Sequence, residues 1–539
     1  MQHVGEMPLL IKYLLPREDG LKGRGEIVEA DSTRYGYSDL RTRVARMANA
    51  LCAVGIEAGE TIAVLDWDSA RYLECYFAIP GMGCTLQTVN VRLSPEQVRY
   101  TISHAGASTA IAHPDFFSLV TGGWEGRSPL RRIIPIGTNS ELPTSSIPFT
   151  HDLASLCGDA SQDFAFLDLD ERTVATRFYT SGTTGLPKAV QYSHRQVVLH
   201  TLGTLATLGT APIQGRFHVD DVYMPMTPLF HAHAWGMPYA AALLGTKQVY
   251  PGRYVPANML RLIRDEGVTF SHCVASILQM LLDDPLSPEI DLSAMKILIG
   301  GGPLPTGLAR RALDRGIDVF TGYGMSETGP IQTVNLLTRS ELAADRDEQV
   351  RLRTRAGRPA LLCHVQTKDS ACADTPVGTE GEVTFRAPWL TEGYAGDEAG
   401  TADLWEGGWL HSGDIGVFGQ DGALRITDRM KDVIKSGGEW ISSQDLEGLI
   451  STVAGVSEVA VIGIPDERWG ERPLALVVAP GGAPVIDTVR QFLINAAEQG
   501  VISRYAIPEQ IVTVEKLART SVGKLDKKAL RSRYATDIR

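Results

Sequence analysis

The ten residues from Tyr179 to Lys188 limit the possible folds of this chain more than any other feature. They read Tyr-Thr-Ser-Gly-Thr-Thr-Gly-Leu-Pro-Lys, with three hydroxyl residues and two glycines among the six positions 181–186. Glycine allows the backbone to approach a ligand closely. Inward-facing N–H groups, hydroxyls and a lysine together bind anions. The segment therefore predicts a phosphate-binding loop.

The flanks of this loop indicate a hairpin and not a Walker A loop. The Walker A motif needs a lysine directly after its second glycine and then a helix, but two residues separate Gly185 from Lys188. Segments 173–179 and 188–193 instead alternate like two strands. From composition alone, a polar hairpin without a ligand remains an alternative.

Further motifs follow the loop in order along the chain. They are Gly-Gly-Gly-Pro-Leu-Pro (300–305, after the mostly apolar 295–299), Tyr-Gly-Met-Ser-Glu-Thr (323–328), Trp-Leu-His-Ser-Gly-Asp (409–414), Thr-Asp-Arg-Met-Lys-Asp (427–432), Lys-Ser-Gly-Gly-Glu-Trp-Ile (435–441) and Arg-Thr-Ser-Val-Gly-Lys (519–524). Together they resemble the motifs of adenylate-forming enzymes, the superfamily of acyl-CoA synthetases, peptide-synthetase adenylation domains and luciferases. The resemblance covers nearly the whole chain. It departs at Ala518, where the family usually has proline.

The resemblance implies a site for ATP and Mg²⁺. Glu327 and Thr184 would bind the metal, because Mg²⁺ prefers hard oxygen ligands beside phosphate. Lys524 would be the catalytic cation between the acyl carboxylate and the α-phosphate, with Glu327 and His231 also counted as catalytic. The implied ATP- and AMP-binding residues are Thr180, Ser181, Gly182, Thr183, Thr184, Gly185, Lys188, Gly301, Gly302, Pro303, Tyr323, Gly324, Met325, Ser326, Thr328, Asp414 and Arg429.

The segment 226–236 resembles the acyl-pocket motif of fatty-acyl-CoA synthetases and their relatives, the 3-methylmercaptopropionate-CoA ligases. The implied pocket residues are His231, Trp235, Gly302 and Gly324. Trp235 would gate the acyl tunnel. The alternative for His231 is a structural role as a buried histidine of the core. The bulky side chains of Trp235 and Met237 near the pocket favour a short or medium acyl group or 3-methylmercaptopropionate as the acid.

The same resemblance implies a second step in which CoA attacks the acyl adenylate. The C-terminal domain would rotate about Lys431 and present a thiolation face made of Lys435, Gly437, Gly438, Glu439 and Trp440. A purely structural Gly-Gly turn is the alternative. Two other functions stay open: a stand-alone adenylation enzyme that loads a carrier protein, and a catalytically silent relative.

Strands and helices alternate along the chain, which predicts parallel sheets covered by helices. Segment 351–426 is β-rich instead. We expect an α/β fold with a large, multi-subdomain N-terminal domain (1–430) and a small mobile α/β C-terminal domain (431–539). The predicted strands are 60–65, 108–112, 218–226, 246–250, 382–385, 458–464 and 474–478, and the predicted helices are 40–54, 95–103, 234–244, 443–450 and 487–500.

Composition limits the partners and the compartment. A net charge of −12 argues against nucleic acid as a main partner. The chain has no run of 18 apolar residues and no secretory leader pattern at its start, so neither a membrane span nor export is expected. Seven scattered cysteines without zinc-ligand spacing indicate reduced, buried thiols in the cytoplasm. We expect a homodimer that binds a carboxylic acid, ATP and CoA.

Overall fold

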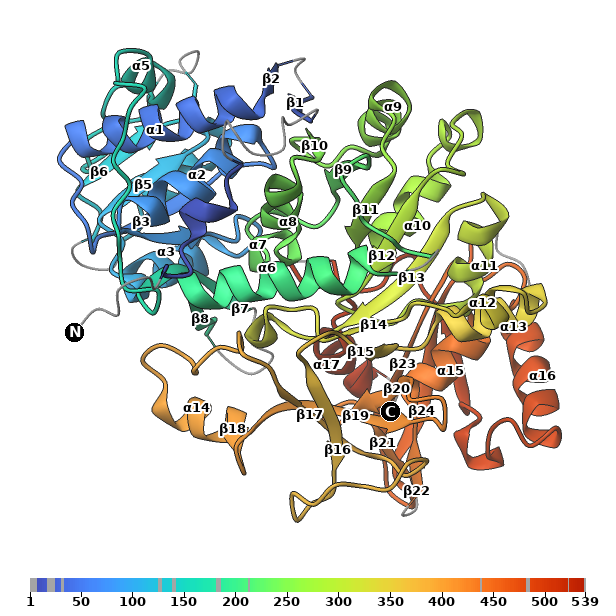
Figure 1. The fold of residues 1–539 in the computed structure, drawn as a ribbon. Helices are drawn as coiled ribbons and strands as arrows, with labels where there is room; N and C mark the ends of the chain where they lie inside the picture. The colour runs from blue at the N-terminus through green and yellow to red at the C-terminus, as the bar shows by residue number, and fades with distance from the viewer. Residues whose placement is uncertain are drawn as a thin grey trace.

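The computed structural model describes residues 7–16, 25–30, 33–124, 128–137, 142–180, 186–211, 214–436, 439–480, 485–521 and 523–537. Four sheets organise this part of the chain (Figure 1). Two are mostly parallel and covered by helices, one is antiparallel, and one belongs to the C-terminal elements. The predicted α/β architecture, with its β-rich part and its separate C-terminal part, is confirmed.

The first mostly parallel sheet has six strands in the order β6-β5-β3-β4-β7-β8. All its neighbours are parallel except β7 and β8, which form an antiparallel hairpin with Thr180 opposite Lys188. The predicted hairpin on either side of the glycine-rich loop is therefore confirmed. The strands are β3 (Thr61–Leu65), β4 (Thr85–Thr88), β5 (Thr109–Ala112), β6 (Arg132–Pro135), β7 (Val174–Thr180) and β8 (Lys188–Ser193), and the helices are α1 (Tyr37–Ala53), α2 (Ala70–Gly81), α3 (Pro95–Ala105), α4 (Phe117–Thr121) and α5 (Leu153–Gly158).

Local sequence signals explain where these helices begin and end. Helix α3 begins after Ser94, whose side chain forms a capping box with Gln97, and Pro95 occupies the first turn. It ends at Gly106 in the left-handed conformation. A second capping box at Ser193 begins α6 (His194–Gly209) directly after β8.

The second mostly parallel sheet has nine strands in the order β15-β14-β13-β12-β11-β9-β10-β1-β2. Its central strands are parallel, so their carboxyl ends lie at one edge, where ligands bind in open α/β sheets. The strands are β1 (Glu26–Glu29), β2 (Arg34–Gly36), β9 (Val222–Pro225), β10 (Lys247–Tyr250), β11 (Phe270–Cys273), β12 (Lys296–Ile299), β13 (Asp318–Tyr323), β14 (Thr333–Val334) and β15 (Arg358–Pro359), with helices α7 (Ala232–Trp235), α8 (Met237–Leu244), α9 (Pro256–Glu266), α10 (Ala275–Asp283), α11 (Thr306–Asp314), α12 (Arg339–Leu342) and α13 (Arg346–Arg353).

The β-rich part and the C-terminal part complete the fold, and both lie in the lower half of Figure 1. The C-terminal part has its own apolar core around Ile450, Val461 and Val489. The β-rich elements are β16 (His364–Lys368), β17 (Gly381–Arg386), α14 (Glu398–Leu404), β18 (Trp405–Glu406), β19 (Trp409–Phe418) and β20 (Leu424–Arg429); the C-terminal elements are β21 (Ile434–Ser436), β22 (Glu439–Ile441), α15 (Ser443–Ile450), β23 (Glu458–Asp466), β24 (Gly470–Val478), α16 (Val485–Glu498), β25 (Gln510–Thr513) and α17 (Lys527–Asp537).

The predicted helix at 234–244 is wrong at its beginning. Residues 232–235 all have positive φ, between 46° and 56°, so α7 is a left-handed turn. The regular helix α8 begins only after Gly236, which has a φ of 75°. The left-handed conformation costs L-residues roughly 1–2 kcal/mol each. Four consecutive non-glycine residues therefore adopt a strained conformation next to the expected acyl pocket.

The cysteine prediction is correct only in part. All seven cysteines lie in the described part of the chain, and none forms a disulfide. Four are buried, but Cys52 is exposed, and Cys157 and Cys372 are half-buried. The reason is position on the element, because Cys52 lies on the solvent side of α1. Within the same described ranges, no helix is both long and apolar enough to cross a membrane.

Candidate active site

One small pocket brings several of the predicted residues together. Its walls come from the left-handed turn, the ends of β12 and β13, and the loop before α17. The pocket is small and partly open, with a volume of about 30 Å³. The lining residues are His231, Trp235, Leu298, Gly300, Gly301, Gly322, Tyr323, Gly324, Met325, Ser326, Pro330, Ile331 and Lys524.

Lys524 enters this pocket from the C-terminal part of the chain. Its loop is held against the N-terminal part by two hydrogen bonds: Ser276 Oγ donates to the Gly523 carbonyl at 3.0 Å, and Asn90 Nδ2 donates to Ser521 Oγ at 3.0 Å. Removal from solvent lowers the pKa of the Lys524 ammonium to about 8. The nearby charge of Arg429 lowers it further, whereas Asp414 and Glu327 oppose the shift. Lys524 thus lies near charged residues that the resemblance implies for the nucleotide, Asp414 and Arg429, and for the metal, Glu327.

Tyr323, Asp414 and Arg429 form a connected group beside the pocket. The Tyr323 hydroxyl donates to Asp414 Oδ2 at 2.8 Å, and Arg429 Nε lies 3.2 Å from Asp414 Oδ1. Asp414 and Arg429 are opposite each other on β19 and β20, which explains their pairing. Burial raises the pKa of Asp414, and Arg429 opposes that rise. A short carboxylate held in this way can accept two neighbouring hydroxyl groups.

Glu327 and Lys188 are joined through Tyr394. Glu327 is buried, and the Tyr394 hydroxyl donates to its Oε1 at 2.7 Å. Burial raises the pKa of Glu327, which the hydrogen bond from Tyr394 opposes. The Lys188 ammonium lies 4.5 Å from the centre of the Tyr394 ring and 3.0 Å from Asp397 Oδ2. Tyr394 and Asp397 come from an irregular segment without a recognisable motif, so no sequence pattern points to either of them.

The glycines of the site allow close approaches of the backbone. A Cβ at Gly301 would lie 2.9 Å from Lys524 Cε, and a Cβ at Gly300 would lie 2.9 Å from the Trp235 ring. Gly324 has a φ of 156°, and a Cβ there would overlap the Pro330 carbonyl oxygen. Larger residues at these positions would fill the pocket or displace Lys524.

His231 and Trp235 stand at the two ends of the left-handed turn. Trp235 is only 4% exposed, and its ring lies 4.9 Å from that of His272. Burial lowers the pKa of His231 to about 3, as does the nearby charge of Lys524, so His231 is neutral at pH 7. A buried histidine, His233, anchors the turn through a 2.6 Å hydrogen bond between its Nε2 and Thr176 Oγ1. The turn therefore presents a neutral imidazole and an indole to the pocket.

Several predicted residues lie elsewhere or outside the described ranges. Ser181, Gly182, Thr183, Thr184 and Gly185 are outside the described residues, as are Gly437 and Gly438. Gly302 and Pro303 are exposed and are not among the residues that line the pocket, and Thr328 is buried in the turn behind it.

The predicted thiolation face is likewise away from the pocket in this arrangement. Lys435 and Trp440 lie on the β21–β22 hairpin, where Trp440 is 58% exposed. Glu439 belongs to β22, and Lys431 is exposed before β21. The structure thus has Lys524, and not the predicted thiolation face, at the pocket.

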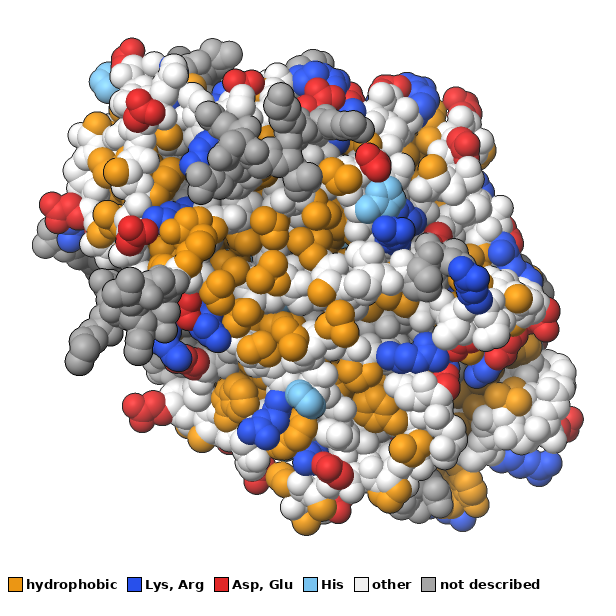
Figure 2. Space-filling model, viewed as in Figure 1, with side chains coloured by type: hydrophobic (Ala, Val, Ile, Leu, Met, Phe, Trp, Pro, Cys, Tyr) orange, Lys and Arg blue, Asp and Glu red, His pale blue; other side chains and the backbone are white. Residues whose placement is uncertain are grey.

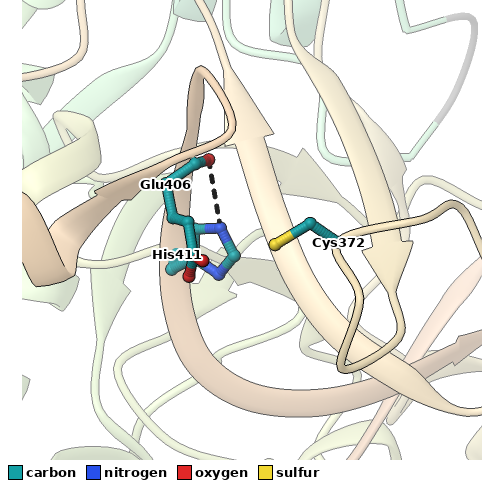
Figure 3. Close-up of side chains that lie close together, drawn as sticks. All are labelled: Cys372, Glu406 and His411. Atoms are coloured by element: carbon teal, nitrogen blue, oxygen red, sulfur yellow. Dashed lines mark hydrogen bonds between the residues drawn. The ribbon is translucent and has the colours of Figure 1, made fainter.

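Cys372, Glu406 and His411 also lie close together, at one edge of the β-rich part (Figure 3). His411 Nδ1 is 2.8 Å from Glu382 Oε2, and His411 Nε2 is 3.3 Å from the Glu406 carbonyl oxygen. Both ring nitrogens therefore face oxygen atoms in this arrangement. Glu382 also accepts the Gly413 N–H at 2.9 Å, so the group braces the turn that carries Asp414.

Known proteins are similar to this chain along nearly its whole length. The AMP-binding enzyme family matches residues 20–395, and the AMP-binding enzyme C-terminal domain matches residues 445–524. A long-chain-fatty-acid–CoA ligase of Thermus thermophilus is 36% identical over 529 residues, which cover 96% of this chain and 94% of that protein. A 3-methylmercaptopropionyl-CoA ligase of Ruegeria lacuscaerulensis is 33% identical over 537 residues, or 98% and 97% of the two chains.

Solved structures share the fold at lower identity. The anthranilate CoA ligase AuaEII, crystallised with anthranoyl-AMP, superposes with a TM-score of 0.85 at 22% identity over 98% of both chains. The family matches and the two relatives span almost all of the sequence in which the ordered motifs occur. The chain therefore belongs to the AMP-binding enzyme family, among the acyl-CoA synthetases of the adenylate-forming superfamily.

Proposed function

We propose that this protein is an ATP-dependent, AMP-forming acyl-CoA ligase whose acid is a short- or medium-chain fatty acid or 3-methylmercaptopropionate. The observation that carries the proposal is the meeting of Lys524 with the turn from His231 to Trp235 in one pocket, beside Tyr323. A cation, an apolar acyl wall and a nucleotide-binding face are thus next to one another. That arrangement suits the joining of a carboxylate to a nucleotide.

In the first half-reaction, a carboxylate oxygen attacks the α-phosphorus of ATP. The bond from the α-phosphorus to the bridging oxygen breaks, and pyrophosphate leaves with that electron pair. Lys524 would relieve the repulsion between carboxylate and phosphate, because a positioned ammonium stabilises charge that develops on both. Asp414 would accept the ribose hydroxyls, with Arg429 keeping it ionised. Lys188, Thr180 and the 181–185 loop would hold the β- and γ-phosphates.

The residues present fit the Mg²⁺ that the family implies. Glu327 supplies a buried carboxylate, and Tyr394 occupies its Oε1 with a hydrogen bond, which leaves Oε2 as the natural metal ligand. Thr184 would be the second protein ligand. When bound, Mg²⁺ neutralises phosphate charge beside Lys188. Titration with Mn²⁺ as a probe, in buffer free of calcium, tests this assignment. The Glu327→Gln variant should bind Mn²⁺ more weakly than the wild-type protein.

In the second half-reaction, the CoA thiolate attacks the acyl carbon and AMP leaves. Lys524 must withdraw from the pocket to make room for pantetheine, and rotation about Lys431 would bring the β21–β22 hairpin with Lys435, Glu439 and Trp440 to the same place. The glycines at 437 and 438 suit a strand edge that passes close to a thin ligand. The domain boundary at 430/431 is part of this proposal.

The acyl preference rests on Trp235. The indole lies against Gly300 and lines a pocket of about 30 Å³, so a longer acyl chain would require Trp235 or a neighbour to move. A small displacement admits a short acid, and a larger one admits a longer chain. Relatives named for long-chain, medium-chain and 3-methylmercaptopropionyl substrates are all similar to this chain, so similarity alone leaves the length open.

The decisive experiment is a coupled AMP-release assay with CoA and a panel of acids from C2 to C16 plus 3-methylmercaptopropionate. AMP release that depends on both CoA and an acid of two to ten carbons supports the proposal. AMP release with phosphopantetheinylated carrier protein but not with CoA would instead establish the carrier-loading alternative. Lys524→Ala is the matched variant, which should form acyl-CoA from a supplied acyl adenylate but not from acid and ATP.

We also propose a homodimer in a cytoplasmic compartment. Residues 196–214 contain no charged residue, although α6 is partly exposed through Leu202, and apolar side chains gather over this helix in Figure 2. Leu361 and Leu362, next to the same helix, are also exposed, and the Leu361 N–H donates to Thr207 Oγ1. An uncharged face can meet a second copy of itself without like-charge repulsion. Light scattering of wild-type and Leu202→Lys protein measures the expected change from dimer to monomer.

A further inference from the structure

Helix α15 of the C-terminal part is held at both ends by residues that precede Lys431. At its beginning, Asp428 Oδ2 accepts hydrogen bonds from the Ser443 N–H at 2.6 Å and from Ser443 Oγ at 2.7 Å. Asp428 is almost fully buried at the end of β20. A carboxylate at a helix N-terminus is favourable, because it satisfies free N–H groups and faces the positive end of the helix dipole.

At its other end, α15 meets the beginning of α11. Gly307 is the second residue of α11, and its N–H donates to Ser451 Oγ at 3.4 Å. A Cβ on Gly307 would lie only 2.3 Å from the Ser451 carbonyl oxygen. Since Ser451 is the C-cap of α15, the negative end of one helix here faces the positive end of the other. The approach is so close that only glycine fits at position 307.

A short chain of contacts connects α15 to the catalytic loop. Lys527 Nζ donates to Ser443 Oγ at 2.6 Å and pairs with Glu447 Oε1 at 2.7 Å. Ser443 Oγ thus accepts from Lys527 while it donates to Asp428. Lys527 is three residues beyond Lys524, at the beginning of α17. The position of α15 is therefore transmitted to the loop that carries Lys524 into the pocket.

We propose that Gly307 and Asp428 are positioning residues for the adenylation half-reaction, which dock α15 so that Lys524 reaches the pocket. This inference rests on the proposed function, since it assigns the docked arrangement to one of the two half-reactions. If the C-terminal domain turns about Lys431, both contacts separate, because Gly307 and Asp428 precede that residue and α15 follows it. The second half-reaction would then proceed without them.

The test separates the half-reactions in the full-length Gly307→Ala enzyme. Pyrophosphate exchange with hexanoate measures adenylation, and acyl-CoA formation from supplied hexanoyl adenylate measures thioester formation. Adenylation should fall by about 10- to 100-fold, because a displacement of about 1 Å at a catalytic group has an effect of that size. Thioester formation should stay within about twofold of wild type, because a displaced α15 keeps the separate apolar core of the C-terminal part intact.

Gly448→Ala is the matched control. Gly448 lies on α15 and faces the same helix α11, but a Cβ there would be 3.9 Å from Thr306 Oγ1, an ordinary contact. The Gly448→Ala enzyme should carry out both half-reactions at the wild-type rates. Ser443→Ala provides a second variant, because it removes the hydroxyl that links Asp428 to Lys527. It should also slow adenylation selectively.

The outcomes are distinguishable. A selective loss of adenylation in Gly307→Ala and Ser443→Ala, with Gly448→Ala unaffected, supports the inference. Equal loss of both half-reactions, or normal adenylation in a folded Gly307→Ala enzyme, overturns it while the proposed function stands. If wild-type protein carries out neither half-reaction with any acid of the panel, the proposed function fails and the inference fails with it.

Discussion

The pH dependence of adenylation should report the ionisation of Lys524. Its pKa is lowered to about 8, first by removal from solvent and then by the charge of Arg429, while Asp414 and Glu327 oppose the shift. The ammonium is the active form, so activity is present below this pKa and is lost as pH rises through it. At a pKa of about 8, roughly nine-tenths of Lys524 is charged at pH 7 and roughly one-tenth at pH 9.

The assay is kcat/KM for ATP in the adenylation step, since this constant reports the free enzyme. The value of kcat/KM should fall about tenfold between pH 7 and pH 9, and about tenfold per pH unit beyond. The pH profile of kcat should bend at a higher pH than that of kcat/KM, because bound phosphates stabilise the Lys524 ammonium in the enzyme–substrate complex. The matched variant is Lys524→Arg, whose guanidinium stays charged. It should be slower throughout, but flat in kcat/KM from pH 7 to pH 9.

Two results would refute the reasoning. One is a wild-type kcat/KM that stays constant to pH 10, which would mean that Lys524 has an ordinary pKa or no role. The other is a Lys524→Arg enzyme with the same break near pH 8, which would assign the ionisation to another group.

Three further predictions address the hinge, the gate and the strained turn. Lys431→Pro should retain pyrophosphate exchange but lose acyl-CoA formation, because proline fixes the φ that rotation must change; normal activity in both steps would place the hinge elsewhere. Trp235→Ala should favour longer acids and weaken the binding of a short one by about 1–3 kcal/mol, measured as rate ratios across the panel; an unchanged ratio in a folded enzyme rules out the gate. Ala234→Gly should leave the melting temperature unchanged or raise it, because glycine relieves about 1–2 kcal/mol of left-handed strain and loses only about 0.8 kcal/mol of apolar burial. Ala240→Gly, in the right-handed helix α8, is the control and should lower the melting temperature. An equal fall in melting temperature for both variants would show that the turn is unstrained.

The sequence predicted the parts of the site that local backbone chemistry encodes. Tyr323 and Asp414, which the resemblance implies for the same nucleotide, are joined by a hydrogen bond of 2.8 Å between the last residue of β13 and the middle of β19. The hairpin before Lys188 was also readable, since alternation on both sides of a glycine-rich loop has few other solutions. These features depend on short segments, whose residue pattern largely determines the local backbone structure.

Contacts between distant segments could not be read in the same way. Tyr394 bonds Glu327 from an irregular segment whose residue types indicate no role. The turn around Ala234 reads as helix, because alanine favours helices, but the buried hydrogen bond from His233 to Thr176 holds the chain in another conformation. Gly307 reads as an ordinary helix residue until α15 is placed against it. In each case a tertiary contact overrides the local preference.

The pairing of Lys188 with Asp397 has a consequence for nucleotide selection. The cation expected to hold the outer phosphates already carries a counterion 3.0 Å away, and both side chains are partly exposed. Under the proposed function, nucleotide entry at this position would therefore exchange one anion for another and would not fill a bare positive site. A triphosphate competes with a carboxylate through its greater charge, whereas AMP, which lacks the outer phosphates, gains nothing from the exchange. Under the proposed function, Lys188 would return to Asp397 when pyrophosphate leaves, and AMP would then have no contact with this lysine.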